Sequence, residues 1–455
     1  MKTALVLFTR DLRVRDQPAL AAAVREAQRV VPAFVLDDAL LAGVGAAPNR
    51  LAFLLDSLRD LDGALRERGA RLVVRRGEIV AETLRLAREC GVEAIYMGGD
   101  VSAYARSRER RLEEACERER IALRVFDGVT VVAPGAIVPA GGDHYRVFTP
   151  YWRAWREVPR RTPLPAPRRV AMPRGIAQAR LPPLAELTRV QCSPELPSGG
   201  ESVARKRLER WLRTGLAEYE ARHDDLAGDA TARLSPYLHF GCLSASAVLA
   251  RSEDRPGGEA FARQLCWRDF YHQVLAARPD FPYADYRPRG RRWRRSARLV
   301  EAWRRGLTGY PIVDAGMRQL EREGFMHNRA RLITASFLAK TMRIDWRIGA
   351  EHFASLLLDG DLACNTGNWQ WVAGTGNDTR PNRVLNPLRQ ARRFDPDGEY
   401  VRRYIPELAA IAGRAVHEPW RLPVGERRRL DYPPPVIDYG ATADERGARV
   451  ARGRS

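Results

Sequence analysis

Residues 359–371 combine side chains that bind polar groups with side chains that stack on flat ones: Asp359, Asp361, Asn365, Trp369 and Trp371. Carboxylates and amides hydrogen-bond the polar edges of a ligand, whereas indole rings pack against planar surfaces. A segment with both properties favours a protein that binds a planar redox cofactor. Packing of the two rings in an ordinary core is the alternative.

Three tryptophans stand in different surroundings along the chain. Trp293 lies among arginines and is expected near the surface, Trp346 is expected at the end of an apolar helix, and Trp369 lies in an acid- and amide-rich loop. A surface, a middle and a deep indole could form an electron relay to a buried cofactor. Aromatic packing is the commoner role of such rings, so both interpretations stay open.

Two segments offer groups that suit phosphate and ion-pair contacts. Thr231 and Ser235 carry hydroxyl groups and come shortly before Pro236. Proline suits the first turn of a helix, where free N–H groups can hold a phosphate. Asn328 and Arg331 are three residues apart and share a helix face, so Arg331 could pair with Asp359 or Asp361. Simple helix capping and a solvated helix are the alternatives.

Two further segments suit nucleic acid. Gln264, Trp267 and Arg268 fall on one helix face, and an amide, an indole and a cation together suit a flipped base. Residues 287–295 form a basic run around one tryptophan, which suits contact with a phosphate backbone. An amphipathic helix anchored by tryptophan and a solvated charge run are the respective alternatives.

Composition narrows the class of partner. The chain has 455 residues and a net charge of +20, carried mostly by arginine, so nucleic acid is the first partner to expect and a membrane surface the second. A generally basic surface is the alternative. The six cysteines are scattered without a C-x-x-C pair, which argues against a metal centre or a disulfide framework and favours a reducing cytoplasm. We expect no secretory signal and no membrane span.

The first 130 residues alternate short apolar runs with amphipathic segments. We expect strands at residues 4–8, 30–36, 72–75, 94–97 and 122–126, and helices at residues 18–28, 50–68, 78–90 and 103–120. This alternation predicts a parallel sheet covered on both faces, with Asp16 capping the first helix. No G-x-G-x-x-G follows the first strand, and residues 43–45 are expected to form a loop.

Three parts are expected along the chain: an α/β domain at residues 1–130, a connector at 131–200 and a helical domain at 201–455. Prolines crowd residues 159–200, which favours a segment that lies over the surface. Beyond the connector, helical periodicity is clearest at residues 203–219, 259–276, 297–305, 313–323, 328–341 and 348–358.

These segments together resemble the photolyase/cryptochrome family over nearly the whole chain, in particular the class I photolyases that repair cyclobutane pyrimidine dimers. The motifs that carry the resemblance are residues 7–13, 231–238, 267–270, 308–315, 326–329, 359–362, 369–371 and 394–398. Residues 380–387 resemble the actinobacterial photolyases. The resemblance implies a Rossmann-like α/β domain with a five-stranded parallel sheet, followed by an all-α domain that binds FAD, and it implies light-driven repair of UV-damaged DNA by a monomer.

The resemblance also assigns residues to FAD. The residues expected to hold the cofactor are Tyr219, Thr231, Ala232, Arg233, Leu234, Ser235, Arg268, Arg331, Asp359, Gly360 and Asp361. Asn365 is expected at flavin N5, where hydrogen bonding favours the reduced state. Trp369, Trp346 and Trp293 match the family's three-tryptophan photoreduction chain, so the relay becomes the favoured interpretation.

The remaining roles implied concern DNA and light harvesting. The residues expected to hold the flipped lesion and its backbone are Gln264, Trp267, Asn328, Arg329, Trp371 and Gln390. An antenna chromophore is expected in the α/β domain, an 8-hydroxy-5-deazaflavin of the coenzyme F420 type in preference to methenyltetrahydrofolate. Its expected contacts are Phe34, Asp37, Asp100 and Tyr104.

The chain departs from the family pattern at several positions. Gln264 stands where dimer photolyases usually carry glutamate, which an amide cannot replace as a proton donor or a negative charge. Other differences are Phe325, Leu332, Thr366 and Asn368. A blue-light photoreceptor of the cryptochrome type is the main rival interpretation. A (6-4) photolyase fits less well, because Asn328 and Leu332 stand where two histidines are needed, and a flavin-dependent redox protein without DNA would leave the basic loop unexplained.

Overall fold

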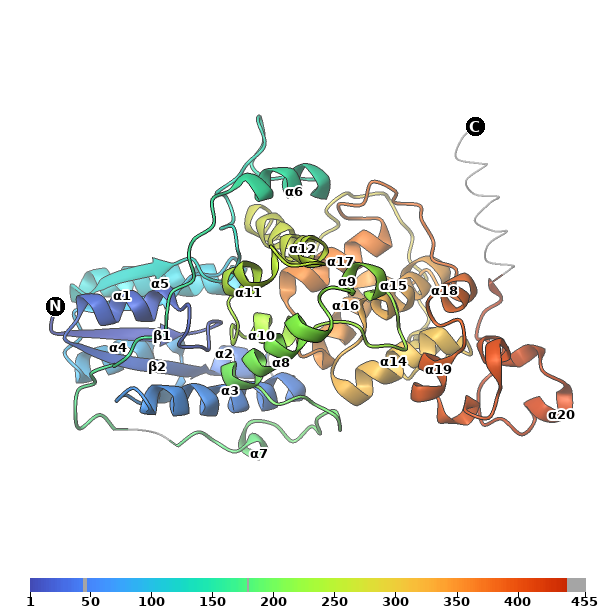
Figure 1. Cartoon of the computed structure of the whole chain (residues 1–455), viewed down its shortest axis with the longest axis horizontal. Helices are drawn as coiled ribbons and strands as arrows, with labels where there is room; N and C mark the ends of the chain where they lie inside the picture. Colours follow the sequence, from blue (N-terminus) through green and yellow to red (C-terminus); the bar gives the residue numbers. More distant parts are fainter. Residues whose placement is uncertain (44–46, 178–179, 440–455) are drawn as a thin grey trace.

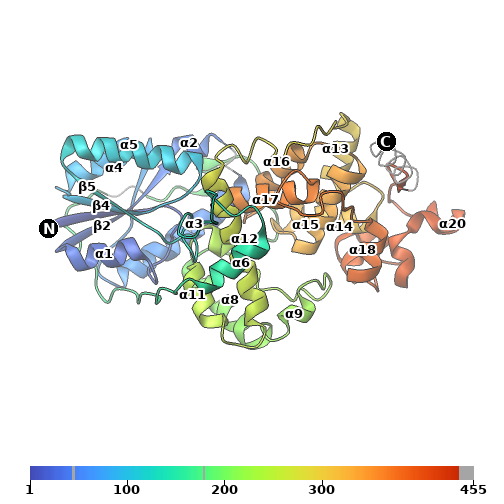
Figure 2. The same ribbon diagram turned by 90° about the horizontal axis from the view of Figure 1, so that it is seen from above.

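A computed structural model describes residues 1–43, 47–177 and 180–439 of the chain. An α/β unit lies at one end of the molecule and a large group of helices at the other (Figures 1 and 2). The described residues contain no helix long and apolar enough to cross a membrane.

Five parallel strands form one sheet in the order β3-β2-β1-β4-β5. The strands are β1 (Thr3–Phe8), β2 (Arg29–Asp37), β3 (Val73–Gly77), β4 (Ala94–Gly98) and β5 (Ala122–Phe126). Ala4 of the central strand lies opposite Val30 on one side and Ala94 on the other. All six residues of β1 are buried, as a parallel sheet covered on both faces requires. The predicted sheet is confirmed, and each predicted strand overlaps an observed one.

Helices cover both faces of the sheet. They are α1 (Pro18–Glu26), α2 (Asp38–Leu41), α3 (Pro48–Arg66), α4 (Ile79–Glu89) and α5 (Ala103–Glu119). Alternate residues of β1 point to opposite faces: Val6 packs in one apolar cluster with α1 and α3, and Leu5 in another with α4 and α5. Figure 2 shows these two helix pairs on opposite sides of the sheet.

The predicted cap of α1 is wrong by one residue. Gln17 is the N-cap, and its side-chain oxygen accepts from the Leu20 N–H at 2.8 Å. Asp16 has a φ of 49°, and its carboxylate accepts instead from the backbone N–H of Leu164 at 2.9 Å. The left-handed turn at Asp16 therefore directs its side chain to the connector. Of the loop expected at residues 43–45, Val44 and Gly45 lie outside the described residues.

The segment after the sheet carries α6 (Phe148–Glu157) and α7 (Leu184–Leu187). Asp269, in the long helix α12 (Gly258–Ala277), fastens this segment: one carboxylate oxygen accepts from the backbone N–H groups of Val131 and Val132 and from the indole of Trp155, all within 3.0 Å. The apolar cluster that covers α1 and α3 continues through α6 into α12. The division at residues 130 and 200 stays a prediction, since this core runs across both boundaries.

The helical part follows. Its first helices are α8 (Glu201–Thr214), α9 (Tyr219–Arg222), α10 (Ser235–His239), α11 (Ala245–Ser252), α12, α13 (Ala297–Arg304), α14 (Pro311–Glu323) and α15 (Asn328–Ser336). A π-helical turn, η2 (Phe337–Thr341), and the helices α16 (Trp346–Leu356), α17 (Leu362–Ala373), α18 (Pro387–Phe394), α19 (Glu399–Tyr404) and α20 (Val424–Arg427) complete it, with short 3₁₀ turns η3 (Pro406–Leu408), η4 (Gly413–His417) and η5 (Pro419–Arg421).

Two expectations about the tryptophans are corrected here. Trp369 lies in helix α17 and not in a loop, because Asp361 caps the helix by accepting from the Cys364 N–H at 2.9 Å and Gly374 ends it with a φ of 74°. Trp346 begins helix α16 instead of ending one, since Asp345 caps a new helix there. The helix expected at residues 328–341 divides into α15 and the π-helical turn.

We expect Asp269→Ala to lower the free energy of unfolding by about 3 kcal/mol or more, because two backbone N–H groups and one indole N–H lose a buried acceptor. The measurement is chemical denaturation followed by circular dichroism. Asp280→Ala is the control: Asp280 is exposed and pairs only with Arg278 among the described residues, so its loss should cost about 0.5 kcal/mol or less. Equal effects of the two substitutions would contradict the anchoring role.

Candidate functional site

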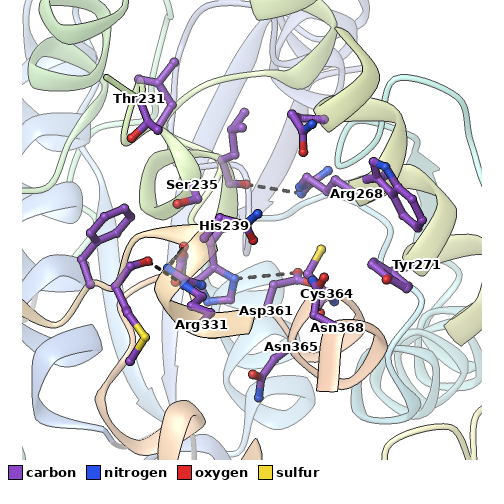
Figure 3. A pocket seen from close by; sticks show the side chains of 18 of the residues that line it. Thr231, Ser235, His239, Arg268, Tyr271, Arg331, Asp361, Cys364, Asn365 and Asn368 are labelled. Carbon is purple, nitrogen blue, oxygen red and sulfur yellow. Dashed lines mark hydrogen bonds and ion pairs between the residues drawn. The ribbon is translucent and has the colours of Figure 1, made fainter. Parts of the chain in front are cut away.

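A cavity of about 450 Å³ lies among helices of the C-terminal part (Figure 3). Three groups of predicted residues line it. The cofactor group is Tyr219, Thr231, Ala232, Arg233, Leu234, Ser235, Arg268, Arg331, Asp359 and Asp361. The DNA group is Gln264, Trp267, Asn328 and Trp371, and the electron-transfer group is Asn365 and Trp369. Segments separated by more than a hundred residues thus meet around one space.

An ion pair forms one wall of the cavity. Arg331 of α15 donates to Asp359 at 2.9 Å and to the carbonyl oxygen of Met326 at 2.7 Å, which confirms the predicted Arg331–Asp359 pair. The second oxygen of Asp359 is buried and has no hydrogen-bond partner among the described residues, and the same holds for the hydroxyl of Thr231. Buried polar atoms without a partner are costly, so these two can serve a bound ligand.

The carboxylate of Asp361 lies at another wall, where the α/β part meets the helices. Arg10, which follows β1, donates to it at 2.6 Å and donates to Asp100, after β4, at 2.9 Å. Burial by itself would raise the pKa of Asp361, but the charges of His272 and Arg10 outweigh burial and hold that pKa well below its ordinary value. Burial lowers the pKa of the neighbouring His239.

Stacked aromatic rings support the open side of the cavity. Trp267 of α12 lies parallel to Phe148 of α6, with ring centroids 3.7 Å apart and an angle of 3° between the planes. The guanidinium of Arg263 lies 5.6 Å from the Phe148 ring. The plane of the Trp267 indole is therefore set by a residue of the connector, while its neighbour Gln264 is exposed at the cavity.

The tryptophans expected to pass electrons lie in one region of the core. Trp369 and Trp346 are buried, and Trp293 is half-buried. Gly349 is three residues after Trp346 on the same face of α16, and the Trp369 ring occupies the space that a side chain at Gly349 would fill. The Trp346 indole donates to Asp285 at 3.0 Å. The backbone N–H of Arg294 donates to the carbonyl oxygen of Arg343 at 2.7 Å, which brings the Trp293 segment close to the start of α16.

Some predicted residues lie away from the cavity lining. Gly360, Arg329 and Gln390 are not part of it. Arg329 forms an ion pair with Asp224 at 2.5 Å, and the side-chain oxygen of Gln390 is buried without a partner among the described residues. Their roles toward DNA or cofactor stay predictions.

The four residues expected at the antenna lie at or near the carboxyl ends of strands β2 and β4. The hydroxyl of Tyr104 donates to Asp37, and Phe34 is buried in β2. Asp100 accepts from Arg10, which also donates to Asp361 of the helical part. The antenna role of these residues stays a prediction.

Sequence reasoning missed several residues of the site. Arg10 lies in the motif at residues 7–13, but the sequence assigns it no role. Its two carboxylate partners, Asp100 and Asp361, are 90 and 351 residues away along the chain. Phe148 showed no local signal beyond the apolar periodicity of its helix. His272 lies 3.4 Å from Asp361. It stands four residues after Arg268 on α12, so the helical pattern could have placed it on the same helix face.

One group in the described part of the chain has the residue types of a metal site. Donor atoms of His272, Asp361 and Cys364 lie within 4.8 Å of one another. The positive charge of Arg10, 2.6 Å from the same Asp361, opposes a cation there.

Comparison with known proteins shows the family. A model of the FAD binding domain of DNA photolyase matches residues 261–452, and a DNA photolyase model matches residues 4–168. The chain is 54% identical to a deoxyribodipyrimidine photo-lyase of Streptomyces griseus, across 100% of this chain and 99% of that protein. This chain belongs to the photolyase/cryptochrome family. The likeness to actinobacterial photolyases is confirmed, since Streptomyces griseus is an actinobacterium.

Solved structures agree with this assignment. A class III photolyase from Agrobacterium tumefaciens matches with a TM-score of 0.92 and 31% identity, covering 100% of this chain and 98% of that one. A cryptochrome from Synechocystis matches with a TM-score of 0.91 and 29% identity, covering 98% of this chain and 99% of that one. The predicted architecture, a five-stranded parallel sheet followed by a helical part, is the fold of this family.

The residues around the cavity fit FAD. The partnerless atoms of Thr231 and Asp359 supply a hydroxyl group and a carboxylate acceptor, and Ser235 adds a second hydroxyl. Arg233, Arg268 and Arg331 also line the cavity, and guanidinium groups are a type of group that binds phosphates. Aromatic and aliphatic side chains provide the surfaces that a flat ring needs.

We expect Gly349→Ala to lower the free energy of unfolding by about 1–3 kcal/mol, because the new Cβ would come within 2.1 Å of the Trp369 ring and displace it. Chemical denaturation measures the cost, and tryptophan fluorescence reports the displaced ring. Gly63→Ala is the matched control, since a Cβ there meets nothing within 4 Å in helix α3 and should be neutral or raise stability by about 0.4–1 kcal/mol. A stability for Gly349→Ala equal to that of the control would contradict the contact.

Proposed function

We propose that this protein repairs cyclobutane pyrimidine dimers in DNA. The Streptomyces griseus relative is named a deoxyribodipyrimidine photo-lyase, and the observation that carries the assignment here is one cavity that joins FAD-type contacts to base-type contacts. When bound and reduced, FAD supplies the light-excited electron that splits the dimer. The protein side chains bind and orient the cofactor and the dimer and exclude water from them. No protein nucleophile is required.

The cavity has a cofactor side and a substrate side. Thr231, Ser235 and the Arg331–Asp359 pair support a role in holding FAD. Gln264, Trp267 and Trp371 support a role in receiving an extruded dimer, through base stacking and hydrogen bonds to base edges. A lesion that stacks poorly costs less to extrude, which favours damaged over intact bases.

The arginine-rich surface supports the partner in this proposal. A net charge of +20 favours a polyanion, and sequence-neutral contacts to phosphates give affinity that falls with salt. We expect the protein to act as a monomer on UV-damaged DNA. We expect it in the cytoplasm, a location that its six free cysteines support.

Two further roles complete the proposal. Trp293, Trp346 and Trp369 would pass electrons inward to the cofactor, which the contact of Gly349 with the Trp369 ring supports. An antenna chromophore, 8-hydroxy-5-deazaflavin in preference to methenyltetrahydrofolate, would bind near Phe34, Asp37 and Tyr104, because ligands of open parallel sheets bind at the carboxyl ends of strands.

The test uses reduced, FAD-loaded protein and an oligonucleotide with one cyclobutane thymine dimer, in blue light and in darkness. Return of intact thymines only in light is the expected result. A cryptochrome-like photoreceptor is the rival, given the structural likeness to the Synechocystis cryptochrome. Bound, light-responsive flavin without repair in either condition would favour that rival.

Trp369→Phe should block photoreduction of the oxidised cofactor, because it removes the indole that lines the cavity. Repair by chemically pre-reduced protein should stay largely intact. Absorbance under blue light with an external reductant measures the first quantity, and the dimer assay measures the second. Trp303→Phe is the control, since Trp303 is an equally buried indole that contacts Trp369 but does not line the cavity. Unchanged photoreduction in Trp369→Phe would contradict the relay.

Trp267→Ala should weaken binding of dimer-containing DNA by about 1–3 kcal/mol, the contribution of one base stacked on an aromatic ring. Fluorescence anisotropy with damaged and undamaged oligonucleotides measures the difference. Binding of undamaged DNA serves as the internal control, because phosphate contacts do not involve this ring. An unchanged dissociation constant for damaged DNA would rule out stacking on Trp267.

Gln264→Glu should raise the yield of dimer repair per absorbed photon, because a carboxyl group can supply the proton or negative charge that the amide lacks. Yield is measured with the dimer oligonucleotide under calibrated light. Gln273→Glu on the same helix is a control for added charge, since Gln273 is buried against Tyr145 and does not line the cavity. A yield equal to that of the unchanged protein would mean that the amide suffices.

A further inference from the structure

Arg10 joins the two halves of the molecule. It lies two residues beyond the end of β1, and its side chain is 24% exposed. One guanidinium nitrogen donates to Asp100 at 2.9 Å, and the other donates to Asp361 at 2.6 Å. Its Nε donates to the carbonyl oxygen of His239 at 3.3 Å. A planar guanidinium can satisfy several acceptors at once, so Arg10 fixes all of these groups relative to one another.

Asp361 is the partner that reaches the cofactor side. Asp361 lines the cavity (Figure 3). One of its oxygens caps α17 by accepting from the Cys364 N–H at 2.9 Å, and the other accepts from Arg10. A carboxylate that is 7% exposed at the wall of a cavity needs compensating charge. Without Arg10, the ion-pair partners left to Asp361 among the described residues would be His272 at 3.4 Å and His239 at 3.8 Å.

Two histidines, His272 and His239, lie beside Asp361 and Arg10. His272 Nδ1 lies 2.9 Å from the carbonyl oxygen of Arg268, which can only accept, so Nδ1 carries a proton. Nε2 then faces Asp361 at 3.4 Å. His239 Nδ1 lies 3.4 Å from Arg10 and can accept from it. Arg10 in addition pairs with Asp100, which follows β4.

We propose that Arg10 is a positioning residue of the cofactor site, which balances the charge of Asp361 and thereby tunes the affinity and redox potential of FAD. This role rests on the proposed function, because it requires FAD in the cavity. Arg10 acts through Asp361 and does not line the cavity itself. Asp100 also matters in this role, because it competes with Asp361 for the positive charge of Arg10.

The experiment compares purified wild-type protein with Arg10→Gln, Arg10→Lys and Arg13→Gln. Apo-protein titrated with FAD gives the dissociation constant, and spectroelectrochemistry gives the midpoint potential of the bound cofactor. Arg13→Gln is the matched control, because Arg13 is a buried arginine of the same segment whose hydrogen bonds go to the backbone carbonyls of Asp16, Gly128 and Gly241.

Arg10→Gln should bind FAD about tenfold or more weakly, and its midpoint potential should become more negative, since an unbalanced Asp361 opposes an added electron. Arg10→Lys should recover most of both values, because it restores the charge. Adding Asp361→Asn to Arg10→Gln should return the potential toward that of wild type. Arg13→Gln should lower thermal stability without moving the potential. Wild-type affinity and potential in Arg10→Gln would overturn the proposal, as would an equal shift in Arg13→Gln.

Asp100→Asn tests the same idea without altering Arg10. It removes the competing carboxylate, so the midpoint potential should become more positive, and a negative shift or none would overturn the proposal. The dimer-repair assay on wild-type protein is run separately. Protein that binds FAD but leaves the dimer intact would overturn the repair function while the Arg10 result stands on affinity and potential alone.

Discussion

The carboxylate of Asp361 caps a helix, accepts a hydrogen bond from an arginine and lines the cavity at the same time. One oxygen caps α17 and so fixes the helix that carries Asn365, Trp369 and Trp371, while the other accepts from Arg10 at 2.6 Å. A buried carboxylate is stable only where such donors surround it. The orientation of the helix that faces the cofactor is therefore tied to the first strand of the sheet, and the α/β part contributes to the site without lining it.

Close packing fixes the other walls of the same cavity. Neither Gly349 nor Gly367 leaves room for a side chain, because a Cβ would lie 2.1 Å from the Trp369 ring in the first case and from the Tyr271 ring in the second. Helices α12, α16 and α17 approach closely at these points. Such contacts hold aromatic rings at fixed positions, as the proposed electron relay requires.

The two sides of the cavity differ in what supports them. Ion pairs and partnerless polar atoms occur on the side that we propose for the cofactor, whereas the side that we propose for the substrate contains Trp267, held flat against Phe148. Phe148 belongs to the segment that Asp269 fastens to α12, so the connector supports the site without lining the cavity. This difference fits the proposal that one cavity holds a cofactor tightly and receives an extruded lesion transiently.

The sequence alone determined the features that depend on near neighbours. Short apolar runs predicted the five strands, and the motif at residues 359–371 marked one part of the cavity wall, because both patterns are local. The same reasoning failed for α17, where polar residues hid a helix despite a capping aspartate and a closing glycine. Only the tertiary structure decided that Arg10 meets Asp361 across 351 residues and that Phe148 supports Trp267. Contacts between distant segments produce no local pattern in the sequence, because they form only when the sheet and the helices bury their apolar faces together.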